Sequence, residues 1–246
     1  DDVIFLEDEL NKWYFNLLIK AWKSFSRKVE LEDTDFAKAV AKQFSGLKVD
    51  EEQVKFLLAK LNFSGRPSNW SEEQLMKFAQ ELRRKSKPTI IAANKIDMEK
   101  SNENYERIKK RFPEFAIIPC SADFELALRE AAKFNLIEYI PGDSDFKIIK
   151  EANTQQKNAL EKIRNFLKTH ENTGVQQILN FSVFSLLNQI AIFPAGATKL
   201  ADSKGRILPD CFLLPGGSTA LDFAYKLHTD FGKNFIKAID ARTKRA

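Results

Sequence analysis

The stretch TIIAANKID, residues 89–97, decides the fold, because a short apolar run ends there in a polar quartet. The apolar part is partly β-branched and is typical of a strand buried on both faces of a parallel sheet. A helical pattern follows over residues 105–112, and then a second apolar run, FAII, at residues 115–118. Another helix is predicted around residues 126–132. Strand, helix, strand and helix in this order indicate a doubly wound α/β domain.

Polar residues follow both predicted strands at the point where each strand ends. Asn94, Lys95 and Asp97 come after the first strand, and Ser121 and Ala122 come after the second. Ligands of open α/β sheets bind beyond the carboxyl ends of the strands. We therefore expect the two loops to lie on adjacent strands and to form one ligand site.

The Asn-Lys-x-Asp quartet has the chemistry of a guanine reader. Guanine presents two neighbouring donors, N1–H and the 2-amino group, and the Asp97 carboxylate can accept both in a charge-assisted pair. Adenine would leave that carboxylate unpaired, and sites of this kind reject the wrong partner by factors of about 10⁴. Asn94 can brace the loop, and the stem of Lys95 can lie over the base. The alternative is that Asn94 and Asp97 only cap a helix.

A helical region precedes this α/β part. Leu6, Leu10, Trp13 and Leu17 recur at spacings of three and four, which predicts a long amphipathic helix. Further helices are expected from Thr34, after the cap Asp50 with Gln53, and after the cap Ser71 with Gln74. Residues 7–81 are thus predicted to be a compact helical unit. Its aromatic stripe (Trp13, Tyr14 and Trp22) forms a packed core or, alternatively, docks a partner.

After two more predicted helices, at residues 155–168 and 174–187, the pattern changes to β. Strands are expected at residues 189–193, 207–214 and 235–239, with a turn at 202–205. A helix is expected from Ser218 or Thr219 to His228. Two strands, a helix and a further strand suggest a small β-grasp fold that lacks its final strand.

The net charge of +5 is concentrated near the C-terminus. From residue 189 onward nine Lys and Arg stand against five Asp and Glu, a net of +4, while the first 188 residues carry +1. This excess suggests a polyanionic partner, although lysines are often only a solvated face. The candidate RNA-binding residues are Lys199, Lys204, Arg206, Lys226, Arg242, Lys244 and Arg245, with Lys233 and Lys237 nearby.

Composition excludes several classes of protein. Two cysteines and two histidines cannot build a disulfide framework and make a dedicated zinc site improbable, so we predict no metal site. The most apolar stretch, residues 181–193, is too short to span a bilayer. The chain opens on Asp1 without a signal-peptide pattern. We expect a cytoplasmic protein without a membrane partner.

The two polar loops resemble the fourth and fifth signature motifs of P-loop GTPases. The resemblance implies that Asn94, Lys95 and Asp97 read the base. It also implies that the backbone N–H of Ala122 bonds the guanine oxygen and that Ser121 steadies Asp97.

Other stretches extend the resemblance over essentially the whole chain. FLExEL at residues 5–10 and EYIPG at 138–142 resemble the Obg-like GTPases of the YchF subfamily, archaeal type. LPD at 208–210, PGGSTA at 215–220 and HTD at 228–230 resemble the TGS domain, a ubiquitin-like module. Some relatives lack the Lys and Asp of the quartet and prefer adenine nucleotides; both are present here, which implies GTP.

The implied organisation is a partial P-loop GTPase domain with a helical insertion, followed by a β-grasp domain. The expected boundaries are residues 1–6 and 82–188 for the GTPase part, 7–81 for the insertion, and 189–246 for a C-terminally incomplete TGS domain. No G-x-x-x-x-G-K-[ST] pattern occurs in the chain. We expect the complete gene to encode roughly 100 or more further residues before Asp1, holding the phosphate loop and the Mg²⁺ ligands.

The expected function is that of a guanine-nucleotide-binding protein, a GTPase in its complete form, acting on ribosomes or RNA. It would take GTP or GDP with Mg²⁺, and this chain alone would hold no catalytic residue and be inactive in hydrolysis. The alternative is an RNA- or ribosome-binding TGS module whose nucleotide site no longer hydrolyses anything. A third hypothesis makes residues 7–81 a scaffold for protein contacts.

Overall fold

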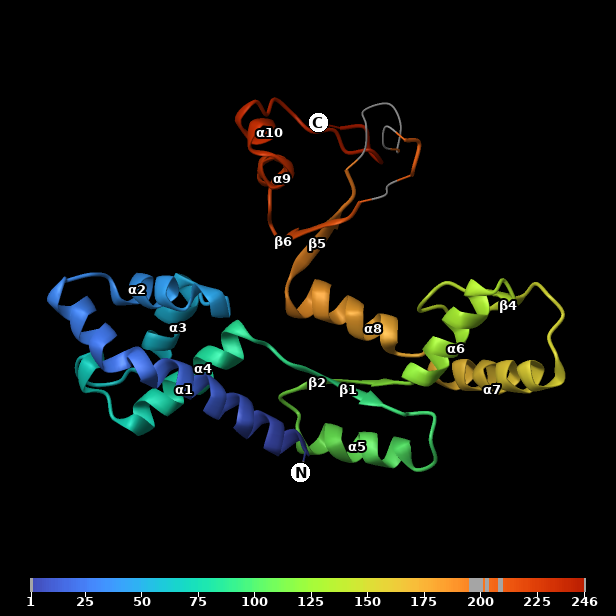
Figure 1. Cartoon of the computed structure of the whole chain (residues 1–246), viewed down its shortest axis with the longest axis horizontal. Helices are drawn as coiled ribbons and strands as arrows, with labels where there is room; N and C mark the ends of the chain where they lie inside the picture. Colours follow the sequence, from blue (N-terminus) through green and yellow to red (C-terminus); the bar gives the residue numbers. More distant parts are fainter. Residues whose placement is uncertain (1, 195–200, 202–203, 208–209, 246) are drawn as a thin grey trace. The chain divides into compact units, whose positions relative to one another are not determined.

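The computed structural model describes residues 2–194, 201, 204–207 and 210–245 (Figure 1). It divides into two compact units, Asp1–Thr89 and Ile90–Ala246. The described residues are mostly helical, with three two-stranded sheets, so the chain is a mixed α/β protein. No helix in these residues is long and apolar enough to cross a membrane.

The first unit is built from helices alone. They are α1 (Asp2–Leu31), α2 (Phe36–Gln43), α3 (Glu51–Leu61) and α4 (Glu72–Ser86), with short 3₁₀ turns at Ser45–Leu47 and Pro67–Asn69. The predicted caps are confirmed, since Asp50 with Gln53 and Ser71 with Gln74 both form capping boxes. Trp22 stacks on Trp70 with ring centroids 5.5 Å apart. The core around this pair contains Tyr14, Leu18, Val40, Leu57, Phe78 and Leu82.

Helix α1 buries a narrower face than its apolar pattern suggests. Tyr14 and Trp22 belong to the core, whereas Leu6, Leu10 and Trp13 are 59%, 41% and 50% exposed. Two apolar stripes lie side by side on this helix, and the other helices cover only one of them. The predicted packed core is therefore confirmed for Tyr14 and Trp22 but not for Trp13.

Helices α1 and α4 are joined by polar contacts at one end. Arg83, only 3% exposed, donates to a Glu7 carboxylate oxygen at 2.5 Å. The Tyr14 hydroxyl lies 3.0 Å from Ser86 Oγ. These two pairs, Glu7 with Arg83 and Tyr14 with Ser86, bring the start of the unit beside its end.

The second unit begins with the predicted strand–helix–strand. Strand β1 (Ile90–Asn94), helix α5 (Ser101–Arg111) and strand β2 (Ala116–Cys120) are followed by helix α6 (Ala122–Lys133). The two strands pair in parallel, so the prediction that they are neighbours is confirmed. The described residues contain only this parallel pair, and the doubly wound sheet stays a prediction.

A second hydrophobic core lies between α6 and α7 (Thr154–His170). Helix α7 packs there through Leu160, Ile163 and Leu167, against Leu128 and Ile137. Two short strands, β3 (Ile137–Glu138) and β4 (Lys147–Ile148), pair antiparallel and have no counterpart in the sequence prediction. The single helix predicted at 174–187 is divided into α8 (Val175–Asn180) and a π-helical turn, η3 (Phe181–Leu186).

The C-terminal region contains an antiparallel pair, β5 (Gln189–Ile192) and β6 (Phe212–Pro215), and two helices, α9 (Ala220–Leu227) and α10 (Thr229–Lys233). The predicted start of α9 is confirmed, because Thr219 forms a capping box with Asp222. The prediction of a strand at 235–239 is wrong: these residues form no strand, and Ile236 is 91% exposed. An apolar run becomes a strand only where a partner strand pairs with it, and no strand of the described residues pairs with this one.

The expected domain boundaries stay a prediction. The predicted division after residue 6 falls inside α1, which continues without a break to Leu31. The β-grasp arrangement also stays a prediction, and part of its expected turn at 202–205 lies outside the described residues.

Candidate nucleotide-base site

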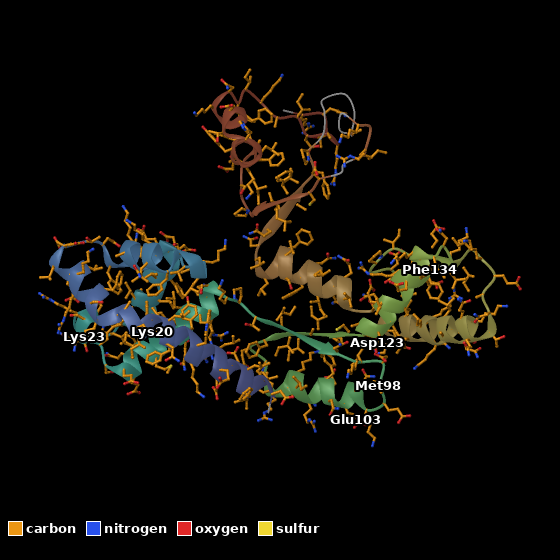
Figure 2. All side chains as sticks on the ribbon, viewed as in Figure 1. Lys20, Lys23, Met98, Glu103, Asp123 and Phe134 are labelled. Atoms are coloured by element: carbon orange, nitrogen blue, oxygen red, sulfur yellow. The ribbon has the colours of Figure 1, made fainter. Side chains whose placement is uncertain are left out.

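The two polar loops lie at the same edge of the β1–β2 pair. Asn94 and Cys120, the last residues of the two strands, stand opposite each other in the register. The backbone N–H of Ile96 donates to the carbonyl of Cys120 at 3.1 Å, which continues the pairing into the first loop. Figure 2 shows Met98 in the loop after β1 and Asp123 at the start of α6, on this edge. The sequence prediction that both loops meet is therefore confirmed.

Asn94 connects the two loops directly. Its Oδ1 accepts from the backbone N–H of Lys95 at 2.8 Å and from that of Ala122 at 3.1 Å. The Cys120 thiol lies 3.9 Å from the same oxygen, and burial raises the pKa of that thiol. The N–H of Ala122, expected to bond the guanine oxygen, thus donates to Asn94 in this structure.

Asp97 is half-buried in the first loop. Within the described part of the chain its carboxylate has no hydrogen bond and no ion pair. Ser121, which the family resemblance pairs with Asp97, is fully buried and instead caps α6, accepting from the N–H of Phe124 at 3.3 Å. Both acceptor oxygens of Asp97 are consequently available to a ligand that offers two donors.

Lys95 adopts a left-handed backbone conformation with φ of 66°. This region is uncommon for residues other than glycine, and it persists only where neighbouring contacts fix it. Here the Lys95 N–H is held by Asn94, and its carbonyl accepts from Met98 N–H at 3.1 Å. The side chain of Lys95 is exposed, while Ile96 beside it is buried. These contacts hold the backbone of the loop at Lys95, and the lysine side chain lies on the surface.

A buried polar network beneath the second loop was not found from the sequence. We call it the Glu125 network, and it consists of Glu125, Arg129, Tyr139 and Thr173. The Glu125 carboxylate accepts from Thr173 Oγ1 at 2.6 Å, Arg129 Nε at 2.6 Å and the Tyr139 hydroxyl at 2.9 Å. Its members come from α6 and from two later segments, up to 48 residues apart. No local spacing in the sequence signals such a cluster.

The network fixes the charge states of its acidic groups. Burial raises the pKa of Glu125, but the hydrogen bonds from Thr173, Arg129 and Tyr139 outweigh burial and hold the pKa below its ordinary value. Burial, assisted by the Glu125 carboxylate, raises the pKa of Tyr139 to about 12. Glu125 is therefore ionised and Tyr139 neutral at physiological pH, each in the state that the hydrogen bonds require.

The predicted RNA-binding residues are distributed over the C-terminal region. Every described member is exposed, and Lys199 lies outside the described residues. Three of them stand on one turn, because the Asp240 carboxylate accepts from the N–H groups of Arg242 at 2.7 Å and Thr243 at 2.9 Å. Asp240 N–H also donates to the carbonyl of Arg245 at 2.9 Å. This Asp240 turn presents Arg242, Lys244 and Arg245 together.

Two family models match the chain from the middle of β1 onward. Residues 92–196 match the Obg-like GTPase YGR210-like, G4 motif-containing domain, and residues 192–245 match the TGS domain. The chain therefore carries a YGR210-like G4 domain of the kind found in Obg-like GTPases, followed by a TGS domain. The resemblance seen in the sequence is confirmed, and the match includes both loops at the edge of the sheet.

Named relatives agree with this assignment. The chain is 42% identical over 247 residues to an uncharacterized GTP-binding protein of Methanocaldococcus jannaschii, covering 99% of this chain and 62% of that protein. The crystal structure of a GTP-binding protein from Pyrococcus horikoshii has a TM-score of 0.77 at 39% identity, covering 99% of this chain and 65% of that one. A ribosome-binding ATPase, YchF, of Buchnera aphidicola is less similar, at 29% over 184 residues, 74% of this chain and 40% of that protein. The chain thus spans less than two thirds of each relative.

Proposed function

We propose that the protein binds a guanine nucleotide through the Asn94–Asp97 loop and the Ser121–Ala122 loop. The observation that carries the proposal is the Asp97 carboxylate, which is half-buried and without a partner in the described structure, at the edge where Asn94 ties both loops together. A carboxylate in this setting offers two acceptors to the two adjacent donors of guanine. The names of the relatives as GTP-binding proteins support the same ligand.

Hydrolysis of GTP with Mg²⁺ is the activity that we propose for the full-length protein. The residues of this chain can contact the base through the Asn94 amide, the Asp97 carboxylate and the Ala122 N–H. The sequence contains no phosphate-loop pattern. Within the described residues no group of three His, Cys, Asp or Glu could hold a metal ion. We therefore assign no hydrolytic step to this chain, and we place the phosphate and Mg²⁺ contacts in other parts of the protein.

Competition between GDP and ADP on the full-length protein tests the base assignment. Because the Buchnera relative is named an ATPase, an adenine nucleotide is the competing ligand against which the preference for guanine is measured. We expect a preference for GDP of about 10⁴-fold or more, since adenine leaves the Asp97 carboxylate unpaired. Equal affinities, or a preference for ADP, would remove Asp97 from the role of guanine reader.

A second proposed function is binding of structured RNA or the ribosome by the TGS domain in a cytoplasmic protein. The Asp240 turn favours it, because a local hydrogen-bonded structure holds three cations within four residues. Binding would be to phosphates, so each cation contributes through release of counterions. The Buchnera relative, named as ribosome-binding, supports this class of partner.

Replacing Arg242, Lys244 and Arg245 by Glu should weaken binding of the full-length protein to ribosomes and flatten its salt dependence. Removing three phosphate contacts should reduce the slope of log affinity against log salt by roughly 2 to 3. Sedimentation with ribosomes at several salt concentrations measures both effects. A matched control replaces the exposed α1 cations Lys20, Lys23 and Arg27 by Glu, two of which are labelled in Figure 2. If both triple variants lose the same affinity for ribosomes, the loss comes from the change in net charge and not from the position of the three cations.

A further inference from the structure

The Glu125 network contacts the second loop through a single residue. Thr173 is 1% exposed and donates its hydroxyl to Glu125, while its carbonyl accepts from the backbone N–H of Ser121 at 2.9 Å. The backbone N–H of Glu125 in turn donates to the carbonyl of Ser121 at 3.2 Å. Thr173 therefore holds the first turn of α6 at both ends, by its side chain and by its main chain.

The segment that carries Thr173 approaches the end of β2 so closely that only glycine fits next to it. Gly174 has φ of 82°, and a Cβ there would lie 2.0 Å from the carbonyl oxygen of Pro119 and 2.8 Å from Cys120 Cα. Cys120 is the residue immediately before Ser121. The backbone of the second loop is thus packed against the 172–174 segment as well as hydrogen-bonded to it.

The opposite side of the network is fixed by Tyr139. Its hydroxyl donates to Glu125 and accepts from the N–H of Gly142 at 3.3 Å, so it has little freedom to turn away. Glu125 is 4% exposed, and its Oε2 accepts from both Thr173 and Tyr139, so the loss of either donor weakens the hydrogen bonding of a buried carboxylate oxygen. Thr173 and Tyr139 are therefore the donors that connect α6 to later segments of the chain.

We propose that Thr173 and Tyr139, through Glu125, are positioning residues for the backbone N–H of Ala122, and so for recognition of the 6-oxo group of guanine. The inference rests on the proposed function, because it presumes that this N–H faces the base. Asp97 lies on the other loop and is not held by the network. Damage to the network should consequently impair reading of the 6-oxo group and leave reading of the 2-amino group intact.

The test compares three nucleotides on the full-length protein: GDP, 6-thio-GDP and IDP. Sulfur is a weaker acceptor than oxygen, so the ratio of GDP to 6-thio-GDP affinity reports the Ala122 contact. IDP lacks the 2-amino group, so the ratio of GDP to IDP affinity reports Asp97. In Thr173→Val and in Tyr139→Phe we expect the first ratio to fall by roughly 2- to 10-fold, the range of one hydrogen bond. The second ratio should change by less than about 2-fold.

A matched control is Thr169→Val, which removes an exposed hydroxyl that bonds only to the carbonyl of Asn165 in α7. It should leave both ratios unchanged. A purely structural role would lower the affinity for all three nucleotides by the same factor, and unchanged ratios in both network variants would overturn the proposal. If wild-type protein binds GDP no better than ADP, the proposed function fails and the inference fails with it. If that selectivity is intact while the first ratio does not move, the inference alone is rejected.

Discussion

Asp97→Asn should lower the affinity of the full-length protein for GDP by at least about 10²-fold and raise its relative affinity for XDP. The amide places its N–H₂ opposite a donor of guanine, which leaves a donor unpaired at a cost of about 1–3 kcal/mol beyond the lost charge-assisted bonds. A 10²-fold loss corresponds to about 2.7 kcal/mol. Xanthine has a carbonyl where guanine has the 2-amino group, so it accepts from the new N–H₂. Calorimetry or competition with GDP, XDP and ADP measures all three affinities.

The control for this variant is Asp123→Asn, the same chemical change at an exposed residue in the first turn of α6 (Figure 2). It should leave the order of the three affinities unchanged. An unaltered GDP affinity in Asp97→Asn would show that Asp97 does not contact the base and that the Asn94–Asp97 loop has only a structural role. A loss of GDP without any gain for XDP would show that Asp97 acts on the loop and not on the base.

Glu7→Leu should lower the free energy of unfolding of the helical unit by about 3–5 kcal/mol, because it leaves the charge of Arg83 buried without its partner. Arg83 is 3% exposed, and its Nε already has no partner among the described residues. All three tryptophans of the chain lie in this unit, so their fluorescence during urea unfolding reports on it alone.

Two further variants test that reading of the ion pair. Glu9 lies on the same helix, and its partner Lys12 is mostly exposed. Glu9→Leu should therefore lower the free energy of unfolding by less than about 1 kcal/mol. The double variant Glu7→Leu with Arg83→Met replaces the pair by apolar side chains and should recover most of the lost stability. If Glu7→Leu costs no more than Glu9→Leu, water reaches Arg83 and the pair carries little energy.

Features that depend on neighbours in the sequence were predictable. The capping boxes at Asp50 and Ser71 were predicted because the cap and its partner are three residues apart. The parallel strand pair and its two loops followed from the alternation of apolar runs and helices. The candidate site residues belong to one quartet and one short loop, each directly after a predicted strand, so the edge of the sheet on which they meet could be inferred from the sequence alone.

Features that depend on tertiary contact were not predictable. The apolar pattern of α1 offers two adjacent stripes, and only the packing of α2 to α4 decides that Tyr14 is buried and Trp13 exposed. The run at 235–239 has the composition of a strand but no partner in the described structure. The Glu125 network joins residues from three separate segments, and Glu125 in the sequence is one acid among 34 Asp and Glu.

The pairing of α1 with α4 also bears on how such a chain could have arisen. Because Glu7 meets Arg83 and Tyr14 meets Ser86, the polypeptide enters and leaves the helical unit at neighbouring points. A segment whose ends meet can be acquired by an existing gene within a single loop, since it does not force the flanking residues apart. The four side chains of these two contacts, Glu7, Arg83, Tyr14 and Ser86, hold the two ends of the segment together. Such a unit can be inserted into another protein as a single piece.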